Sequence, residues 1–323
     1  MGRYLIRRTL FLILVLWVVS VLTFLIFLKL PPGDPARRAA GRRSTPQIIE
    51  LARTNLGLDR PWYVQYGRFA KGLVPWPGFF LNEQVYFSYD NFVPVKEELY
   101  KRLPVTGTLA LGGAVVWLLL GIPIGIASAT KPRSIRDRLG MVFALIGVSA
   151  PVFWLGQLWL FVFWYKLGIA PSSGMEIGAS VWESVLDGRF IGPWIVLSLT
   201  FAAFYARMVR SNLIETLGED YIRTARAKGL SERRVVYRHG VRSALTPVVT
   251  MLGLDIGIVL GGAVITETVF NLPGIGQYVI DALFVADFPV VMGVTIFGAF
   301  FIIVGNLLVD VIYAFLDPRV RYS

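Results

Sequence analysis

Long stretches without any charged side chain are the feature that most limits how this chain can fold. The first, Thr9–Leu28, is twenty residues long and follows Arg3, Arg7 and Arg8. As a helix, twenty residues span about 30 Å, roughly the hydrocarbon core of a bilayer. A cleaved signal peptide would have a shorter apolar region, of about 7–15 residues. The sequence therefore favours a retained membrane anchor at this end of the chain.

Five further apolar segments follow, and each contains at most one ionisable side chain. Hydrophobic residues make up 55% of the chain and charged residues only 16%, which is unlike a soluble domain. We therefore expect an all-α polytopic membrane protein with six transmembrane helices. The other five predicted spans are Val105–Thr130, Leu139–Tyr165 (interrupted by Pro151), Phe190–Ala206, Val248–Thr266 and Phe288–Val309.

The distribution of Lys and Arg predicts which loops lie in the cytoplasm. The short loops carry three at the N-terminus, four at 131–138, nine at 207–242 and two at the C-terminus, whereas the alternate loops carry two and none. Because positive residues favour the cytoplasmic side, both termini and these basic loops are expected there. Residues 31–104 are expected outside despite eleven positive residues, since the rule weakens for loops beyond about 60 residues.

Three parts follow from this topology. Residues 1–30 form the first span, residues 31–104 an extracytoplasmic region, and residues 105–323 a five-helix core with a basic loop at 207–247. Within the outer region, Thr45 and Pro46 predict an N-cap and first turn of a helix that runs to about Leu56. In the core, Gly121 and Gly125 predict close helix packing. Gly253, Gly257 and Gly261 repeat that spacing.

The basic loop at 207–247 has a helical pattern. Leu213, Leu217 and Tyr221 recur every four residues, and Gly229 supplies a helix C-cap position. Ser231 supplies an N-cap for a second helix that begins at Glu232. Two interpretations fit this pattern: a docking surface for a soluble partner, or a loop whose charges only set its side of the membrane.

The sequence lacks the usual catalytic and metal-binding patterns. It has no cysteine and one histidine, so it predicts no disulfide and no His- or Cys-based metal site. It also has no Gly-Lys dipeptide and no Gly-x-Ser-x-Gly elbow, which excludes a phosphate-binding loop and that class of hydrolase. The positive charge lies beside apolar runs, so membrane topology explains it better than nucleic-acid binding. A non-catalytic transporter or channel subunit remains.

Three carboxylates fall within or beside the apolar segments. An ionisable side chain at membrane depth normally faces a bundle interior or an aqueous cavity, so each is a candidate functional residue. Asp255 lies nearest mid-span and either lines a pathway or forms a structural pair. Glu267 lies at an outer helix end, where a helix-end hydrogen bond competes with a transport role. Asp310 is expected to pair with an arginine of the basic loop.

Several blocks resemble the inner-membrane permease subunits of dipeptide, oligopeptide and nickel ABC importers, and the N-terminal pattern is similar to that of the B-type partner. The most specific block is the stretch Asp220-Tyr-Ile-Arg-Thr-Ala-Arg-Ala-Lys-Gly-Leu-Ser-Glu-Arg-Arg234. Other matching blocks extend from Pro32 to Arg319, so the resemblance covers the whole chain. They include Ser149-Ala-Pro-Val-Phe-Trp-Leu-Gly156, Leu260-Gly-Gly-Ala-Val264 and Glu267-Thr-Val-Phe-Asn-Leu-Pro-Gly-Ile-Gly276.

The resemblance implies that the basic loop is a coupling helix between the fourth and fifth spans, which inserts into a groove on a separate ATPase subunit. Small residues would permit close approach, and cationic side chains would donate charge-assisted hydrogen bonds to ATPase carboxylates. The implied contact residues are Asp220, Tyr221, Arg223, Thr224, Ala225, Arg226, Ala227, Lys228, Gly229 and Leu230. Of these, Ala225 and Ala227 are the small residues, and Arg223, Arg226 and Lys228 the donors.

The resemblance also implies partners. A second permease subunit would complete a heterodimer, two ATPase subunits would bind ATP and Mg²⁺, and an extracytoplasmic binding protein would deliver the solute. This chain itself would hold no cofactor and would lie in the inner membrane of a prokaryote. The implied substrate is a short peptide, with nickel complexes or oligosaccharides as alternatives. A self-sufficient secondary transporter would show inverted repeats, and we find none in the sequence.

Candidate residues for the translocation pathway are chosen by position. They are Phe153, Gln157, Asp255 and Glu267. Two features depart from the family pattern. Asp255 stands where an uncharged polar residue is expected, and a negative charge there would favour cationic solutes. The aromatic stretch Val85-Tyr-Phe-Ser-Tyr-Asp90 looks like an insertion in the outer region.

Overall fold

The computed structural model describes residues 2–29, 34–41, 44–73, 81, 86–172 and 174–316. Within these residues the chain is helical, and the β pairing is limited to one isolated bridge between Phe87 and Pro94. The all-α expectation is therefore confirmed. The helices are α1 (Gly2–Phe24), η1 (Leu25–Lys29), α2 (Pro35–Ala40), α3 (Pro46–Leu56), α4 (Trp62–Lys71), α5 (Val95–Thr130), α6 (Ile135–Ser149), α7 (Val152–Trp159), η2 (Leu160–Lys166), α8 (Val181–Leu186), α9 (Ile191–Gly218), α10 (Asp220–Ala227), α11 (Glu232–Arg234), η3 (Val235–Gly240), α12 (Val241–Ala244), α13 (Thr246–Leu260), α14 (Val264–Val269), α15 (Ile275–Phe284) and α16 (Phe288–Leu316).

Four segments of the described chain are single helices long and apolar enough to cross a membrane: Thr9–Leu28, Val95–Thr130, Ile191–Gly218 and Phe288–Leu307. Two bent helix pairs bring the number to six if each pair counts as one span. The pair Glu232–Ala244 and Thr246–Leu260 bends by 45°. Six spans therefore agree with the structure only when broken helices are allowed.

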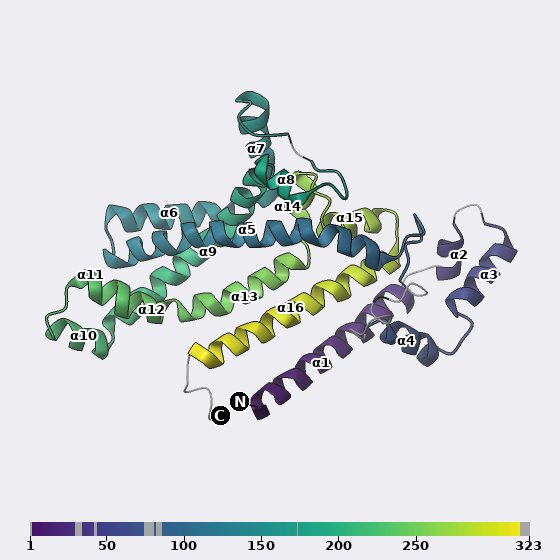
Figure 1. Ribbon diagram of the computed structural model, residues 1–323, viewed down its shortest axis with the longest axis horizontal. Helices are drawn as coiled ribbons and strands as arrows, with labels where there is room; N and C mark the ends of the chain where they lie inside the picture. Colours follow the sequence, from purple (N-terminus) through teal and green to yellow (C-terminus); the bar gives the residue numbers. More distant parts are fainter. Residues whose placement is uncertain are drawn as a thin grey trace.

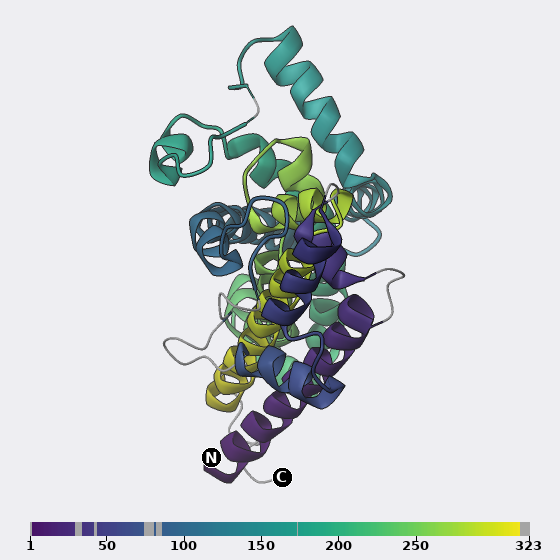
Figure 2. The ribbon, with the colours of Figure 1, turned by 90° about the vertical axis from the view of Figure 1, so that its right-hand side faces the viewer.

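The other bent pair covers the span predicted over Leu139–Tyr165, with its interruption at Pro151. Ile135–Ser149 and Val152–Lys166 meet at 100°, so the interruption is a sharp bend. Ala150 has φ −81° and ψ 122°, an extended conformation. A residue that precedes a proline avoids the helical region, and Pro151 therefore ends α6. Figure 2 shows the result, in which the teal helix of α7 and η2 rises away from the rest of the bundle.

Two helices extend beyond the predicted spans. α5 begins at Val95, ten residues before Val105, and Glu97 and Glu98 in its first turn favour a helix N-terminus. α9 continues past Ala206 to Gly218. Its buried face extends through Val209 and Leu213, so helical packing outweighs the charge of Arg210 between them.

Close backbone packing holds the long helices together, as the glycine spacings predict. A Cβ added to Gly121 would lie 2.9 Å from the Ala202 carbonyl oxygen of α9, and one on Gly125 would lie 2.7 Å from that of Ala206. On the other side, Gly261 of α13 and Gly298 of α16 meet in the same way. Between these two contacts lies the main core, centred on the buried Trp117 and Tyr205.

The two ends of the bundle carry different parts of the chain. In Figure 1 the outer-region helices α2, α3 and α4 lie at one end, together with α15, while α10 and α11 lie at the other. The start of α1 and the end of α16 lie near the α10 end. α3 spans Pro46–Leu56 with Thr45 at its N-cap position, which confirms that predicted helix.

The outer region is fixed to the core through Asp287, which precedes α16. Ser88 Oγ donates a hydrogen bond to Asp287 Oδ2 at 2.5 Å, and the Tyr89 amide donates to Oδ1 at 3.1 Å. Tyr86 and Phe69 pack side by side in the core beneath this contact. The part of the proposed insertion that the structure describes, Tyr86–Asp90, is therefore built into the bundle. Val85 lies outside the described residues.

Candidate functional site

The candidate site at the α10 end of the bundle is a compact helical unit, residues 219–244, which we call the coupling platform after its expected role. Its inner face is apolar. Ile222 and Ala225, one turn apart on α10, are buried against Val235 of η3. Leu217 and Leu230 cover the same cluster from the end of α9 and from the turn after α10. The platform therefore has its own small core and a defined orientation on α9.

Gly229 makes the turn between the two helices of the platform, as predicted. Its φ is +74°, a conformation that glycine adopts without the cost of a side chain. The Gly229 amide donates to the Arg226 carbonyl at 2.9 Å, which closes the end of α10. No atom lies within 4 Å of the position where a Cβ would stand. The turn thus faces open space.

Two ion pairs form between side chains of the platform. Arg226 donates to both Glu232 oxygens, at 2.7 and 3.1 Å, and Arg223 donates to Asp220 at 3.1 Å. The hydrogen bond to Glu232 raises the pKa of Arg226, so its guanidinium stays charged. Lys228 is exposed and has no ion-pair partner within the described chain.

Two of the predicted contact residues are engaged within the platform. Ala225 is buried in the platform's own core, because α10 buries one stripe against Val235. Arg226 donates to Glu232 and to the Leu217 carbonyl, and it remains exposed. The exposed residues of the predicted set are Asp220, Tyr221, Arg223, Thr224, Arg226, Ala227, Lys228 and Gly229, and Leu230 is half-buried.

An ion pair that the sequence did not predict, which we call the clamp, joins α9, the helix that carries the platform, to α6. Arg210 of α9 donates to both oxygens of Asp137 on α6, at 2.5 and 2.9 Å. The Arg133 amide donates to the same carboxylate at 2.8 Å. Asp137 is only 6% exposed, so the pair is largely shielded from water. Ser134, the N-cap of α6, was a local signal for the helix start but not for Arg210 as its partner.

A groove of about 610 Å³ lies beside the platform. One wall is the end of α5 with Thr130 and Lys131, and the other is formed by α9, α11 and η3. Ile214 and Tyr237 give the groove an apolar floor, while Arg226 and Arg233 supply positive charge at its side.

Asp255 forms a structural pair. Its carboxylate accepts a hydrogen bond of 2.7 Å from the Tyr205 hydroxyl of α9, and the residue is 9% exposed. Of the two roles that the sequence left open, the structural one is present. The pair joins α13 to the α5–α9 core.

The other pathway candidates differ in their exposure. Phe153 and Gln157, one turn apart, are both exposed on α7. Glu267 is fully buried in α14. The Asp310 side chain lies outside the part of the chain whose side chains are described, so its predicted arginine partner stays a prediction.

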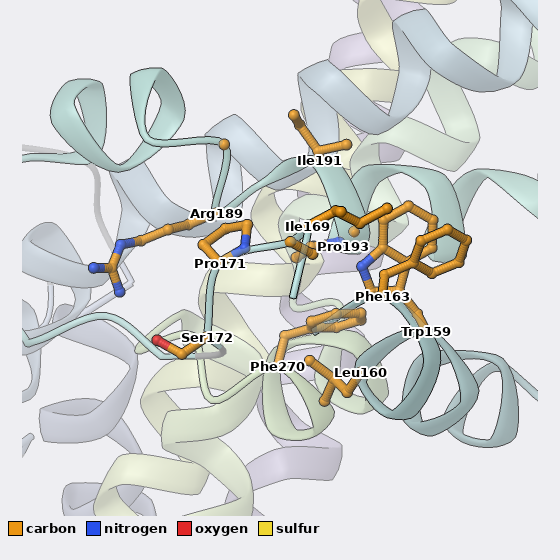
Figure 3. Close-up of a pocket in the computed structure, with 13 residues that line it drawn as sticks. Trp159, Leu160, Phe163, Ile169, Pro171, Ser172, Arg189, Ile191, Pro193 and Phe270 are labelled. Carbon is orange, nitrogen blue, oxygen red and sulfur yellow. The ribbon is translucent and has the colours of Figure 1, made fainter. Parts of the chain in front are cut away.

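An outer pocket of about 260 Å³ lies between η2 and the start of α9. Figure 3 shows its aromatic side, where Trp159 and Phe163 stack and Phe270 of the α14–α15 turn faces them. Ser172 and Arg189 lie on the other side. Arg189 is held in place by donating to the Gly174 carbonyl at 2.8 Å. Within the described residues, no group of three His, Cys, Asp or Glu side chains is arranged to hold a metal ion.

Comparisons with known proteins match the whole chain. The family described as binding-protein-dependent transport system inner membrane component matches residues 121–322, and its N-terminal companion matches residues 1–110. Glutathione transport system permease proteins GsiC are similar along their full length. Those of Salmonella paratyphi A and Salmonella typhimurium are 42% and 41% identical, and one from Escherichia coli is 41% identical, each over 324 residues with 100% of both chains covered.

Proposed function

Since the chain belongs to the family of binding-protein-dependent transport system inner membrane components, we propose that its substrate is a short peptide. The chain is a non-catalytic, multi-pass inner-membrane permease subunit of an ABC importer. Transport of this kind requires ATPase subunits and a binding protein. The observation that carries the substrate proposal is the full-length similarity to permeases named for glutathione, a tripeptide.

The substrate test uses the complete transporter in proteoliposomes, with its own binding protein. We expect ATP-dependent uptake of glutathione or of di- and tripeptides, and no uptake of oligosaccharides or nickel complexes. Ligand identification on the purified binding protein is the independent measurement. Uptake of a sugar or of a nickel complex, without peptide uptake, would contradict the proposal and leave the permease role intact.

The coupling platform is proposed as the contact for an ATPase subunit. Its turn at Gly229 faces open space, and α10 presents Tyr221, Arg223 and Lys228 outward from a fixed base. In this arrangement, closure of the ATPase pair moves the platform, and α9 carries the movement into the bundle as a rigid helix. The contact set is the outward part of the predicted residues, with Ala225 serving the platform's own core.

The positions of the two chain ends support a cytoplasmic placement of both termini. α1 starts and α16 ends near the platform, while the outer region lies at the opposite end (Figure 1). We therefore propose that residues 31–104 face the binding protein. Because the chain has no cysteine, a single cysteine placed in either part reports its side without background. Membrane-impermeant maleimide should label Phe92→Cys, and should label Lys228→Cys only after the membrane is opened.

α7 supports a second permease subunit as partner. Its side chains that face away from α9 and α14 are large, apolar and exposed, and nothing within the described chain covers them. Burial of such a face against a related subunit is favourable, because close van der Waals packing between helices replaces contacts with lipid. Those side chains are Phe153, Trp154 and Leu158, and Phe161 and Trp164 continue the exposed apolar surface on η2. We propose a heterodimer whose pathway runs along this contact, where Phe153 and Gln157 would line it.

Asp255 remains a proposed pathway residue of the inner half. An Asp255→Asn variant keeps an oxygen that accepts from Tyr205, so the structural bond survives while the charge is lost. If the charge selects cationic peptides, uptake of lysine-containing dipeptides should fall several-fold relative to neutral ones. An unchanged ratio removes the pathway role. Tyr205→Phe, which removes the bond and keeps the charge, is the matched control.

A further inference from the structure

The carboxylate of Glu267 is fully buried at the outer end of the bundle. Thr106 Oγ1 of α5 donates to Oε1 at 2.8 Å, and the Gln277 amide donates to Oε2 at 2.9 Å. The Gly276 and Ala263 amides also hydrogen-bond to it. A carboxylate that receives this many N–H and O–H donors remains stable without a cationic partner.

The carboxylate and these two donors belong to three different elements. Glu267 lies on α14, Thr106 on α5, and Gln277 in the first turn of α15. Thr106 Oγ1 also accepts from the Ile275 amide at 2.9 Å, so one hydroxyl contacts both Glu267 and the start of α15. A negative charge at a helix N-terminus is favourable, since the helix presents free amides there. The carboxylate thus joins α5, α14 and α15.

The backbone around this carboxylate leaves no room for side chains. A Cβ on Gly274 would collide with the Glu267 carboxyl carbon. One on Gly276 would lie 2.7 Å from the Val264 Cα atom, and one on Gly262 would lie 2.8 Å from the Gly276 Cα atom. Three glycines therefore shape the α14–α15 turn around a single acidic side chain. Because the backbone packs this closely around the carboxylate, the turn can occupy only one position relative to α14.

The same turn holds the neighbouring outer loop. Asn271 accepts from Gln277 Nε2 at 3.0 Å through its side chain, and from the Met175 amide at 3.3 Å through its carbonyl. Its φ of +47° is a conformation that asparagine tolerates better than most residues. Phe270 of this turn forms one wall of the outer pocket. Whatever fixes the turn therefore also fixes the pocket and the segment at 174–175.

We propose that Glu267 is a positioning residue, which fixes the α14–α15 turn to α5 through Thr106 so that the outer end of the permease moves as one unit with α5 and α9. Glu267 is fully buried and lines neither the outer pocket nor the groove beside the platform, which favours this role over contact with the solute. α9 packs along α5 and continues into the coupling platform. A rigid connection therefore runs from α10 through α9 and α5 to the outer turn.

The connection to α10 rests on the proposed ATPase contact, so the experiment measures ATPase binding separately. It uses the complete transporter in proteoliposomes, with Leu272→Cys as a reporter in the turn. Leu272 is 1% exposed and the chain has no native cysteine, so maleimide labelling of that position reports opening of the turn. The parent is the reporter variant, whose own uptake is measured first.

Two substitutions break the anchor. Glu267→Gln replaces one accepting oxygen by an amide NH2 that faces the Gln277 and Gly276 donors, and Thr106→Val removes the hydroxyl. We expect each to raise the labelling rate and lower uptake about tenfold, because a buried hydrogen-bonding group loses its partner. Copurified ATPase and basal ATP hydrolysis should stay near the parent values. The double variant should add little, since both substitutions break one contact.

The controls keep the chemistry or leave the contact alone. Thr106→Ser retains the hydroxyl and should restore parent behaviour. Thr268→Val makes the same chemical change as Thr106→Val, but at an exposed position on α14, the helix of Glu267. The Thr268 hydroxyl donates to the Val264 carbonyl of its own helix, so this variant should also behave as the parent. Parent-like labelling and uptake in Glu267→Gln and Thr106→Val would overturn the proposal. Loss of ATPase binding in these variants would also overturn it, because it would assign Glu267 to folding of the whole subunit.

Discussion

The polar groups at the two ends of the bundle differ in burial and in hydrogen-bond partners. At the outer end, Glu267 receives its hydrogen bonds from the chain's own backbone and from Thr106. At the platform end, the Tyr221 and Lys228 side chains are exposed. The first arrangement completes itself and fixes a position, whereas the second leaves contacts for another molecule. A polar group's burial and partners thus separate an anchor from a docking surface better than its charge does.

Two glycines express the same contrast. A Cβ on Gly276, at the outer end, would lie 2.7 Å from the Val264 Cα and amide nitrogen atoms, whereas one on Gly229, in the platform, would meet nothing within 4 Å. The outer glycine is required by close packing. The platform glycine is required by its positive φ, and it leaves the surface free for a partner.

The largest effect is expected from Gly229→Trp. The indole should project from the platform and block a docked ATPase, and the positive φ adds local strain to the turn without crowding a neighbour in this chain. We expect loss of copurifying ATPase and of uptake. Gly229→Asn is the control, because asparagine tolerates a positive φ without the bulk and should retain most of both. Normal ATPase binding by Gly229→Trp would mean that the platform is not the contact.

Gly276→Ala tests the outer end with the smallest side chain. The added methyl must displace the Val264 backbone, at a cost of about 1–3 kcal/mol typical of overpacking. We expect a lower thermal midpoint for the purified permease and reduced uptake, with ATPase binding retained. Gly107→Ala is the matched control, since its Cβ would lie in open space on α5. Equal midpoints for the two variants would remove the contrast.

Asp137→Asn tests whether the platform end also contains an anchor. The change leaves Arg210 without its carboxylate partner, and loss of a partner to a charged group costs about 1–3 kcal/mol when the pair is shielded. We expect moderately lower stability and weaker stimulation of ATP hydrolysis by the loaded binding protein. The exchange Asp137→Arg with Arg210→Asp should recover part of the loss. A stable, fully coupled Asp137→Asn variant would show that this clamp is dispensable.

Arg226→Ala should have the smallest effect. Its pair with Glu232 lies on the surface, where ion pairs contribute about 0.2–1 kcal/mol and weaken with salt. We expect a small loss of stability that disappears in high salt, with ATPase binding lowered less than by Lys228→Ala. A larger loss of binding in Arg226→Ala would place its guanidinium in the contact itself.

Local patterns in the sequence predicted local structure well. The apolar runs, the Thr45–Pro46 helix start and the turn at Gly229 each depend on a few neighbouring residues. The break of α6 also had a local signal, because Pro151 interrupts an uncharged run, but its angle of 100° depends on packing. The four-residue repeat placed Tyr221 with Leu213 and Leu217, yet Tyr221 is exposed, because the chain breaks at Glu219 and α10 buries Ile222 and Ala225 against Val235 instead.

Contacts between distant residues were beyond such patterns. Thr106 and Glu267 are 161 residues apart, and Asp137 and Arg210 are 73 apart. Each pair depends on how two helices are aligned, and no periodicity of one segment encodes that alignment. The sequence could show that Glu267 and Asp255 are unusual in an apolar setting, yet it could not name their partners.

The crosswise direction of α7 has a consequence for how this subunit is made. A helix that leaves its bundle at 100° to α6 has one face without a neighbour from its own chain. Gln157 and the tryptophan Trp154 lie on that side, so a newly inserted copy presents a polar amide to lipid until another subunit covers it. We expect an unpaired copy to be recognised by membrane quality control and degraded. Its lifetime in cells, followed by pulse-chase labelling, should lengthen when the second permease is co-expressed.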